Sequence, residues 1–158
     1  MLRYAIKTKT FEVNQGEAMN FQALSTLAGR VLIGVIYVLS GVSKITDYTG
    51  TGQYMASEHM PMIPVLLPAA IMVEIAGGLA VIAGYKARIA AFVLAGYSIL
   101  ATTIFNHFWS MPPGPMQATV MHLFWSTIVM VGACLFIAGM GPGPLSLEGA
   151  ALRKPATA

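Results

Sequence analysis

Charged residues are scarce in this chain. They make up 9% of its 158 residues, whereas hydrophobic residues make up 56% and the mean hydropathy is +0.71. A soluble domain carries about 25% charged residues, because polar surface has to cover its core. Several apolar runs approach the roughly 20 residues that a helix needs to cross a bilayer. The composition therefore predicts an integral membrane protein.

Cysteine is nearly absent, since the chain contains one, Cys134. A single cysteine excludes an intrachain disulfide, a CxxC redox pair and a cysteine-based zinc or iron–sulfur site. The sequence also has no haem-attachment motif and no glycine-rich dinucleotide loop. We therefore expect no metal site, no catalytic residue and no covalently bound cofactor. Electrons for any redox reaction would have to come from a partner protein. Cys134 is expected to be a small packed side chain.

An apolar leader is also missing. Residues 1–23 contain five charged positions and no apolar segment of the kind found in a cleavable signal peptide. We expect the first hydrophobic helix to act as an uncleaved insertion signal. The net charge is +3, but the basic residues form no dense patch, so no nucleic-acid partner is expected.

Four long apolar runs predict an all-α fold, an integral membrane four-helix bundle. The expected spans are about 24–45, 62–84, 87–107 and 118–140, between an N-terminal tail (1–23) and a C-terminal tail (141–158). We interpret residues 46–61 as a polar loop and the proline-rich residues 109–115 as a second loop.

Lysine and arginine predict the orientation of these helices. The N-terminal tail has three, the turn at 85–88 has two and the C-terminal tail has two, whereas the other connections have none beyond Lys44. Cytoplasmic loops of membrane proteins carry the excess of basic residues. We therefore expect a multi-pass protein of the inner (plasma) membrane with both termini in the cytoplasm.

The first span gathers its polar residues and glycines in one stripe. At 100° per residue, Arg30, Gly34, Tyr37, Gly41 and Lys44 share one face of the helix. Glycines allow a neighbouring helix to approach closely. We expect this face to turn inward, which places its charges against protein and not against lipid. Tyr37 is expected either to pack with its hydroxyl bonded to a neighbouring helix or to flank a quinone ring.

Glu74 lies near the middle of the second span, where a charged group costs about 3 kcal/mol unless it faces protein or water. Two interpretations are open: a proton-relay or ligand-binding carboxylate, or a structural acid in an ion pair or hydrogen bond. Arg30 is within reach but leans toward the cytoplasm. Lys44 leans inward but starts roughly 13 Å away, so we expect a water bridge. For both cations, the alternative is that the charge reaches out to the interface.

Polar side chains also follow one face of the third span, at Ser98, Thr102 and Asn106. His107 and His122 lie at the outer ends of the third and fourth spans, joined by a short loop. They are expected either to form a pair that binds a quinone headgroup, a proton or a metal, or to bond separately to backbone or water. Outward methionines and histidines leave copper binding open as a weak alternative.

A series of short motifs resembles the DoxX family. The chain reads GRVLIGVIYVLSGVSKITDYTGTGQYMA, then MP, VEIAGGLAVIAGY, NHFW and GPGPLSLEGA, over about residues 24–150. The resemblance implies a four-helix membrane protein. The family's founding member is associated with a thiosulfate:quinone oxidoreductase, and other members with redox complexes or oxidative-stress assemblies. Members often carry a Lys-Asn pair early in the fourth helix, where this chain has Ser126 and Thr127, so no role that depends on that pair is expected.

The resemblance favours a membrane subunit or accessory protein of a quinone-linked redox complex. Its partners would be membrane lipid and either redox subunits or further copies of this chain. A structural or assembly protein without a small-molecule site and a small transporter or metal-handling protein are the alternatives. The candidate residues for a quinone, ligand or proton-relay site are Arg30, Tyr37, Lys44, Glu74, His107 and His122.

Overall fold

The computed structural model describes residues 2–153, and the side chains of residues 21–150. Every regular element in this part of the chain is helical, and four helices are long and apolar enough to cross a membrane. The predicted all-α membrane bundle is therefore confirmed. The long helices are α1 (Leu2–Thr46), α3 (Ile63–Ala83), α4 (Ala87–Phe105) and α5 (Pro115–Met140), and within α1 the apolar part begins at Phe21.

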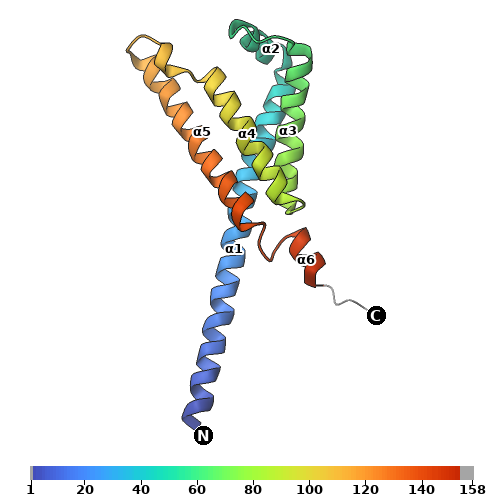
Figure 1. The fold of residues 1–158 in the computed structure, drawn as a ribbon, viewed down its shortest axis with the longest axis vertical. Coiled ribbons are helices and arrows are strands. Elements are labelled where there is room, and N and C mark those ends of the chain that lie inside the picture. Colours follow the sequence, from blue (N-terminus) through green and yellow to red (C-terminus); the bar gives the residue numbers. More distant parts are fainter. Residues whose placement is uncertain (1, 154–158) are drawn as a thin grey trace.

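The helices pack in chain order, α1 on α3, α3 on α4 and α4 on α5 (Figure 1). Contact between α1 and α5 is sparse, and these two helices diverge toward the end of the bundle that carries α2 (Figure 1). A buried cluster that includes Tyr37, Leu94, Val131 and Cys134 joins α1, α4 and α5 at the level where they still meet. Cys134 is fully buried there, as expected for a packed small side chain.

Glycines bring α1 and α3 together. A Cβ atom on Gly34 would lie 2.6 Å from the carbonyl oxygen of Gly78, and one on Gly78 would lie 2.7 Å from the carbonyl oxygen of Gly34. A Cβ atom on Gly41 would likewise lie 2.6 Å from the side chain of Ile75. The glycine stripe of the first span therefore faces the second membrane helix, as expected.

The region between the first two spans corrects one prediction, because residues 46–61 are not simply a loop. They contain the helix α2 (Tyr48–Ser57), which begins after Asp47. The Asp47 carboxylate accepts a hydrogen bond from the Gly50 N–H at 3.1 Å, which caps the helix start. Met55 is buried. A cap and one buried apolar side chain thus stabilise a helix that its two glycines disfavour.

Two shorter helical segments lie in regions interpreted as loop or tail. The 3₁₀ turn η1 (Phe108–Ser110) follows the end of α4, and α6 (Leu147–Arg153) follows the Gly-Pro-Gly-Pro segment. α6 lies against the end of α3, since the Glu148 N–H donates to the Gly84 carbonyl at 3.4 Å.

Candidate functional site

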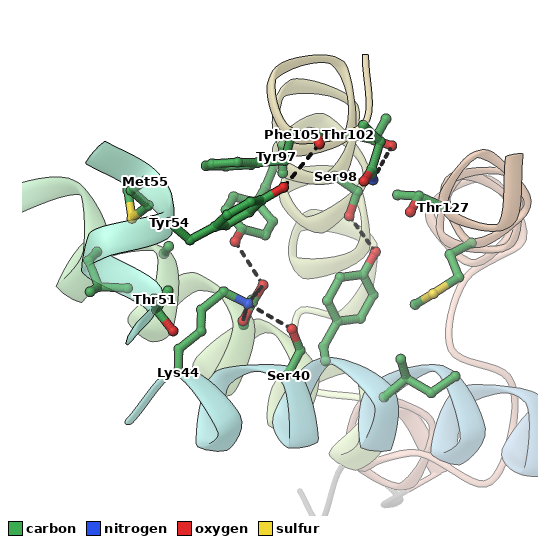
Figure 2. A pocket seen from close by; sticks show the side chains of 18 residues that line it. Ser40, Lys44, Thr51, Tyr54, Met55, Tyr97, Ser98, Thr102, Phe105 and Thr127 are labelled. Atoms are coloured by element: carbon green, nitrogen blue, oxygen red, sulfur yellow. Dashed lines mark hydrogen bonds and ion pairs between the residues drawn. The ribbon is translucent and has the colours of Figure 1, made fainter. Parts of the chain in front are cut away.

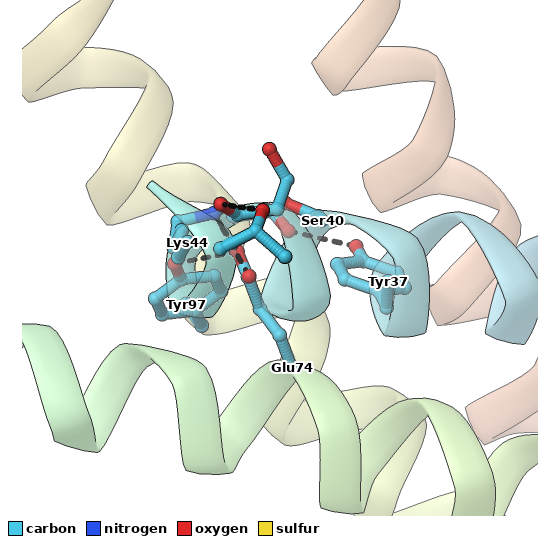
Figure 3. A network of polar contacts seen from close by, with 8 residues as sticks. Tyr37, Ser40, Lys44, Glu74 and Tyr97 are labelled. Atoms are coloured by element: carbon cyan, nitrogen blue, oxygen red, sulfur yellow. Dashed lines mark hydrogen bonds and ion pairs between the residues drawn. The ribbon is translucent and has the colours of Figure 1, made fainter. Parts of the chain in front are cut away.

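An ion pair joins α1 and α3 inside the bundle. The Lys44 ammonium lies 2.9 Å from Glu74 Oε1 and 2.8 Å from Oε2, and it donates to Ser40 Oγ at 2.8 Å. The Tyr97 hydroxyl donates to Glu74 Oε1 at 2.7 Å (Figure 3). The side chain of Glu74 is only 5% exposed and that of Lys44 is 25% exposed. The contact is direct, so the expected water bridge and the alternative of an interfacial lysine were both wrong.

Both charged groups of this network are paired with each other and hydrogen-bonded. An ammonium group has three N–H donors, and Lys44 has three acceptors within hydrogen-bonding distance. Glu74 accepts from Lys44 and from Tyr97. Neither charge is left unpaired in the membrane, which explains how Glu74 is accommodated near the middle of α3.

A second set of hydrogen-bonded side chains lies beside the Lys44–Glu74 network. The Tyr37 hydroxyl is 2.7 Å from Ser98 Oγ, and the Cys134 thiol donates to the Tyr37 hydroxyl at 3.6 Å. If Tyr37 in turn donates to Ser98, the hydroxyl hydrogen of Ser98 is free for a further acceptor. Tyr37 therefore packs with its hydroxyl bonded to a neighbouring helix, which is one of its two expected roles.

Both groups of side chains border a cavity of about 310 Å³, which we call the central cavity (Figure 2). Its lining residues place it between α1, α3, α4 and α5, with α2 at the end that we call its outer end. Its lining includes polar side chains from all five helices around it: Tyr37, Ser40, Lys44, Thr51, Tyr54, Glu74, Tyr97, Ser98, Thr102, Asn106 and Thr127. A cavity with a largely apolar wall and convergent polar groups is a default binding-site candidate.

A contact between α2 and α4 borders the outer end of the cavity. The Tyr54 hydroxyl donates to the Phe105 carbonyl at 3.2 Å, and the two rings stack with centroids 5.4 Å apart. Burial, followed by the nearby Glu58 carboxylate, raises the pKa of Tyr54, so its hydroxyl remains a donor at neutral pH. Next to it, Asn106 donates to Thr102 Oγ1 at 3.1 Å, which leaves the second N–H of the Asn106 amide and the Thr102 hydroxyl hydrogen for other acceptors.

Arg30 lies away from the central cavity. Its guanidinium donates to the Leu145 carbonyl and packs against Gly84 at the end of α3. Arg30 is 1% exposed, so its charge is buried against protein, and its Nε and Nη1 have no hydrogen-bond partner among residues 21–150. The suggested contact between Arg30 and Glu74 is therefore not formed. Arg30 instead joins the C-terminal segment to the bundle.

The two histidines do not line the central cavity. His107 Nδ1 is 2.8 Å from the Ile104 carbonyl and 3.8 Å from a Glu58 carboxylate oxygen, and His122 is exposed. No hydrogen bond joins the two imidazoles in the part of the chain with described side chains. The same part contains no group of three or more His, Cys, Asp or Glu side chains that could hold a metal ion. Of the two alternatives for the histidines, the pair thus has no support in the geometry, and His107 contacts backbone as the other alternative expects.

Ser40, Tyr54 and Tyr97 are among the residues of the site that were not singled out from the sequence. Ser40 lies four residues before Lys44, which is the spacing of helical neighbours, so it could have been found. Tyr97 is a polar aromatic residue within an apolar span, which is a weaker signal. Tyr54 reaches the cavity only because α2 is a helix, and nothing in the sequence alone indicated that.

Comparison with known proteins identifies relatives of the whole bundle. A model of the DoxX family matches residues 25–107. The Escherichia coli (strain K12) protein "Inner membrane protein YqjF" is 30% identical over 125 residues, which cover 79% of this chain and 90% of that protein. "Inner membrane protein YphA" of the same strain is 29% identical over 122 residues, covering 77% of this chain and 86% of that protein.

A more distant similarity covers less of the chain. A "Surfeit locus protein 4 homolog" of Schizosaccharomyces pombe is 35% identical over 69 residues, 43% of this chain and 23% of that protein. No solved structure matches.

Proposed function

This chain belongs to the DoxX family, and from that premise we propose that it is a membrane subunit or accessory protein of a quinone-linked redox complex. In this proposal the central cavity holds the headgroup of a membrane quinone, and the redox centre that exchanges electrons with it belongs to a partner. The observation that carries the proposal is a cavity within the bundle that several polar side chains line, bordered by two helices that diverge.

The donors around the cavity fit a quinone headgroup, which is flat and presents carbonyl oxygens as acceptors. Lys44 and Tyr97 are already bonded to Glu74, so they are not the natural donors. Asn106 has an amide hydrogen left after its internal bond is counted, and Ser98 has a hydroxyl hydrogen left when Tyr37 is the donor in their shared bond. We infer that these two side chains hold the carbonyl oxygens, and that the rings of Tyr54 and Phe105 contact the headgroup.

The chemistry that a bound quinone supplies is the acceptance of electrons and protons. The part of this chain is to bind and orient the headgroup and to keep the site electrically neutral. Because Lys44 and Glu74 cancel each other's charge, the cavity can receive an uncharged ligand without leaving a buried charge unpaired.

Access from the lipid also supports an amphiphilic ligand. The cavity is bordered by Ile36, Tyr37, Ser40 and Lys44 on α1 and by Thr127 and Met130 on α5, the two helices that diverge. An apolar tail in the bilayer can therefore extend between them while the polar headgroup remains inside. We further propose that the protein lies in the inner membrane with both termini cytoplasmic, since YqjF and YphA are named inner membrane proteins and the basic loops agree.

Photolabelling tests the headgroup site directly. The purified chain in lipid nanodiscs is exposed to a photoreactive azidoquinone, and labelled peptides are mapped by mass spectrometry. We expect saturable labelling around residues 98–106 that a short-chain ubiquinone competes away. Ser98→Ala and Asn106→Leu should each weaken this competition about 2-fold to 10-fold, because a hydrogen bond contributes about 0.5–1.5 kcal/mol.

Thr103→Val is the matched control for these variants. Thr103 lies on the same helix but is exposed, and its hydroxyl bonds to the Ile99 and Leu100 carbonyls. It should bind quinone like the wild type. Labelling that does not saturate, or equal competition in all three variants, would contradict the proposal.

The alternative is an assembly protein that has no small-molecule site. The closed Lys44–Glu74 network favours it, since a fully satisfied ion pair stabilises a helix contact without any ligand. Quinone kinetics in complexes that still assemble with the Ser98 and Asn106 variants separate the two functions. Unchanged KM and turnover in both would favour the assembly role.

A further inference from the structure

A second cavity lies on a different face of α3 from the central cavity. It has a volume of about 460 Å³ and lies between α3 and α4; we call it the α3–α4 groove. The central cavity is lined on α3 by Leu67, Ala70 and Glu74. The groove is lined on the same helix by Ala69, Met72, Val73, Ala76, Gly77 and Ala80. At 100° per residue the two sets are centred about 120° apart around the helix, so they occupy different faces.

Small side chains keep the groove open. Ala69, Ala76 and Ala80 form its wall on α3, and Ile89, Ala90 and Val93 form its wall on α4. At Gly77 the two helices are close, because a Cβ atom there would lie 2.9 Å from the Leu94 side chain. The result is an elongated apolar groove along the helix pair.

One end of the groove is positively charged. Tyr85 and Lys86 border it there, and the Lys86 ammonium lies 5.9 Å from the centre of the Tyr85 ring. No ion pair joins Lys86 to an acidic side chain within residues 21–150. α4 also begins at this point with no side chain capping its first N–H groups. Free N–H groups at a helix start and a nearby ammonium together favour a phosphate.

We propose that the α3–α4 groove binds an anionic phospholipid, with one acyl chain between the helices and the phosphate at Lys86 and the start of α4. An apolar groove that ends in a cation matches such a lipid at both ends. A transmembrane helix of a partner would instead bury the Lys86 ammonium in an apolar contact, which is costly. The site is separate from the central cavity and does not depend on the proposed quinone role.

Lipid titration of the delipidated full-length chain in detergent, followed by native mass spectrometry, tests the proposal. We expect phosphatidylglycerol to bind more tightly than phosphatidylcholine. Lys86→Gln should weaken phosphatidylglycerol binding about 5-fold and leave phosphatidylcholine binding unchanged, since a surface lysine contributes about 1 kcal/mol toward anionic lipid. Ala76→Leu should weaken the binding of both lipids, because the added side chain fills the groove.

Two matched controls complete the design. Arg88→Gln removes a charge from the same turn but not from the groove lining, and Ala118→Leu adds the same bulk at an exposed position of α5. Both should bind lipid like the wild type. Equal affinity for the two lipids with no effect of Lys86→Gln would overturn the proposal. So would an Ala76→Leu variant that retains both lipids, or one that instead dissociates an oligomer.

Discussion

Lys44 and Glu74 each depend on the other to be tolerated within the membrane. The carboxylate accepts two contacts from the ammonium and one from the Tyr97 hydroxyl, while Ser40 takes the remaining N–H of Lys44. Removing one partner of a buried pair leaves an uncompensated charge, whereas removing both charges does not. The pair is therefore expected to show strong energetic coupling.

Lys44→Met should lower the free energy of unfolding in lipid-free detergent by about 3 kcal/mol, the lower end of the range for buried pairs, because the lysine is 25% exposed. Glu74→Gln should cost less, since the amide oxygen still accepts from Tyr97. The double variant Lys44→Met/Glu74→Gln should be more stable than Lys44→Met alone. Denaturant titration of the purified variants measures all three.

Lys86→Met serves as the control for this cycle, because Lys86 is exposed and in no ion pair among residues 21–150. Its effect on stability should stay within about 0.5 kcal/mol. If the Lys44 and Glu74 variants behave like this control, or if their effects simply add, the two charges are not coupled.

At the scale of elements, the approach of α1 to α3 depends on a pair of facing glycines. Gly34→Ala places a methyl group against the Gly78 backbone, which cannot move away as a flexible side chain can. We expect a loss of about 1–3 kcal/mol in the free energy of unfolding, the usual cost of overpacking. The same denaturant titration measures it.

Gly132→Ala on α5 is the matched control, since a Cβ atom there would meet nothing within 4 Å. Alanine in a helix interior is favoured over glycine by about 0.5–1 kcal/mol, so this variant should be equally stable or slightly more stable. Equal effects at positions 34 and 132 would show that the close contact between α1 and α3 is not formed.

α2 contacts α4 through the hydrogen bond of one tyrosine hydroxyl and through a stacked pair of rings. Tyr54→Phe keeps the stack with Phe105 but removes the hydrogen bond to its carbonyl. We expect local opening of residues 48–57 to become about 5-fold more frequent, equivalent to about 1 kcal/mol, measured by hydrogen–deuterium exchange. Tyr48→Phe, on the same helix at an exposed position, should leave the exchange unchanged.

At the scale of the whole molecule, the orientation in the membrane follows from the distribution of basic residues. Reporter fusions after Lys86 and at the C-terminus should report cytoplasm, and fusions at Thr51 and Gly114 should report the opposite side. α2 and the outer end of the central cavity would then face away from the cytoplasm, and the α3–α4 groove would end at the cytoplasmic leaflet. A cytoplasmic signal at Gly114 would contradict this arrangement.

The amino-acid sequence by itself determined the membrane class, the four helices and the inward face of α1. These properties depend on local composition and on helical periodicity, which can be read without knowing which helices touch. It also indicated Glu74 as a buried acid and Ser98, Thr102 and Asn106 as one face of a helix, and the central cavity includes all four.

The tertiary structure alone decided which partner each of these residues takes. Arg30 and Lys44 were both candidates for Glu74, and only the packing of α1 on α3 and of the C-terminal segment on α3 assigned them to different partners. His107 and His122 are close in the chain but are not hydrogen-bonded to each other. α5 diverges from α1, and the cavity forms between them, because helix crossing depends on side-chain packing along whole helices and not on any local pattern.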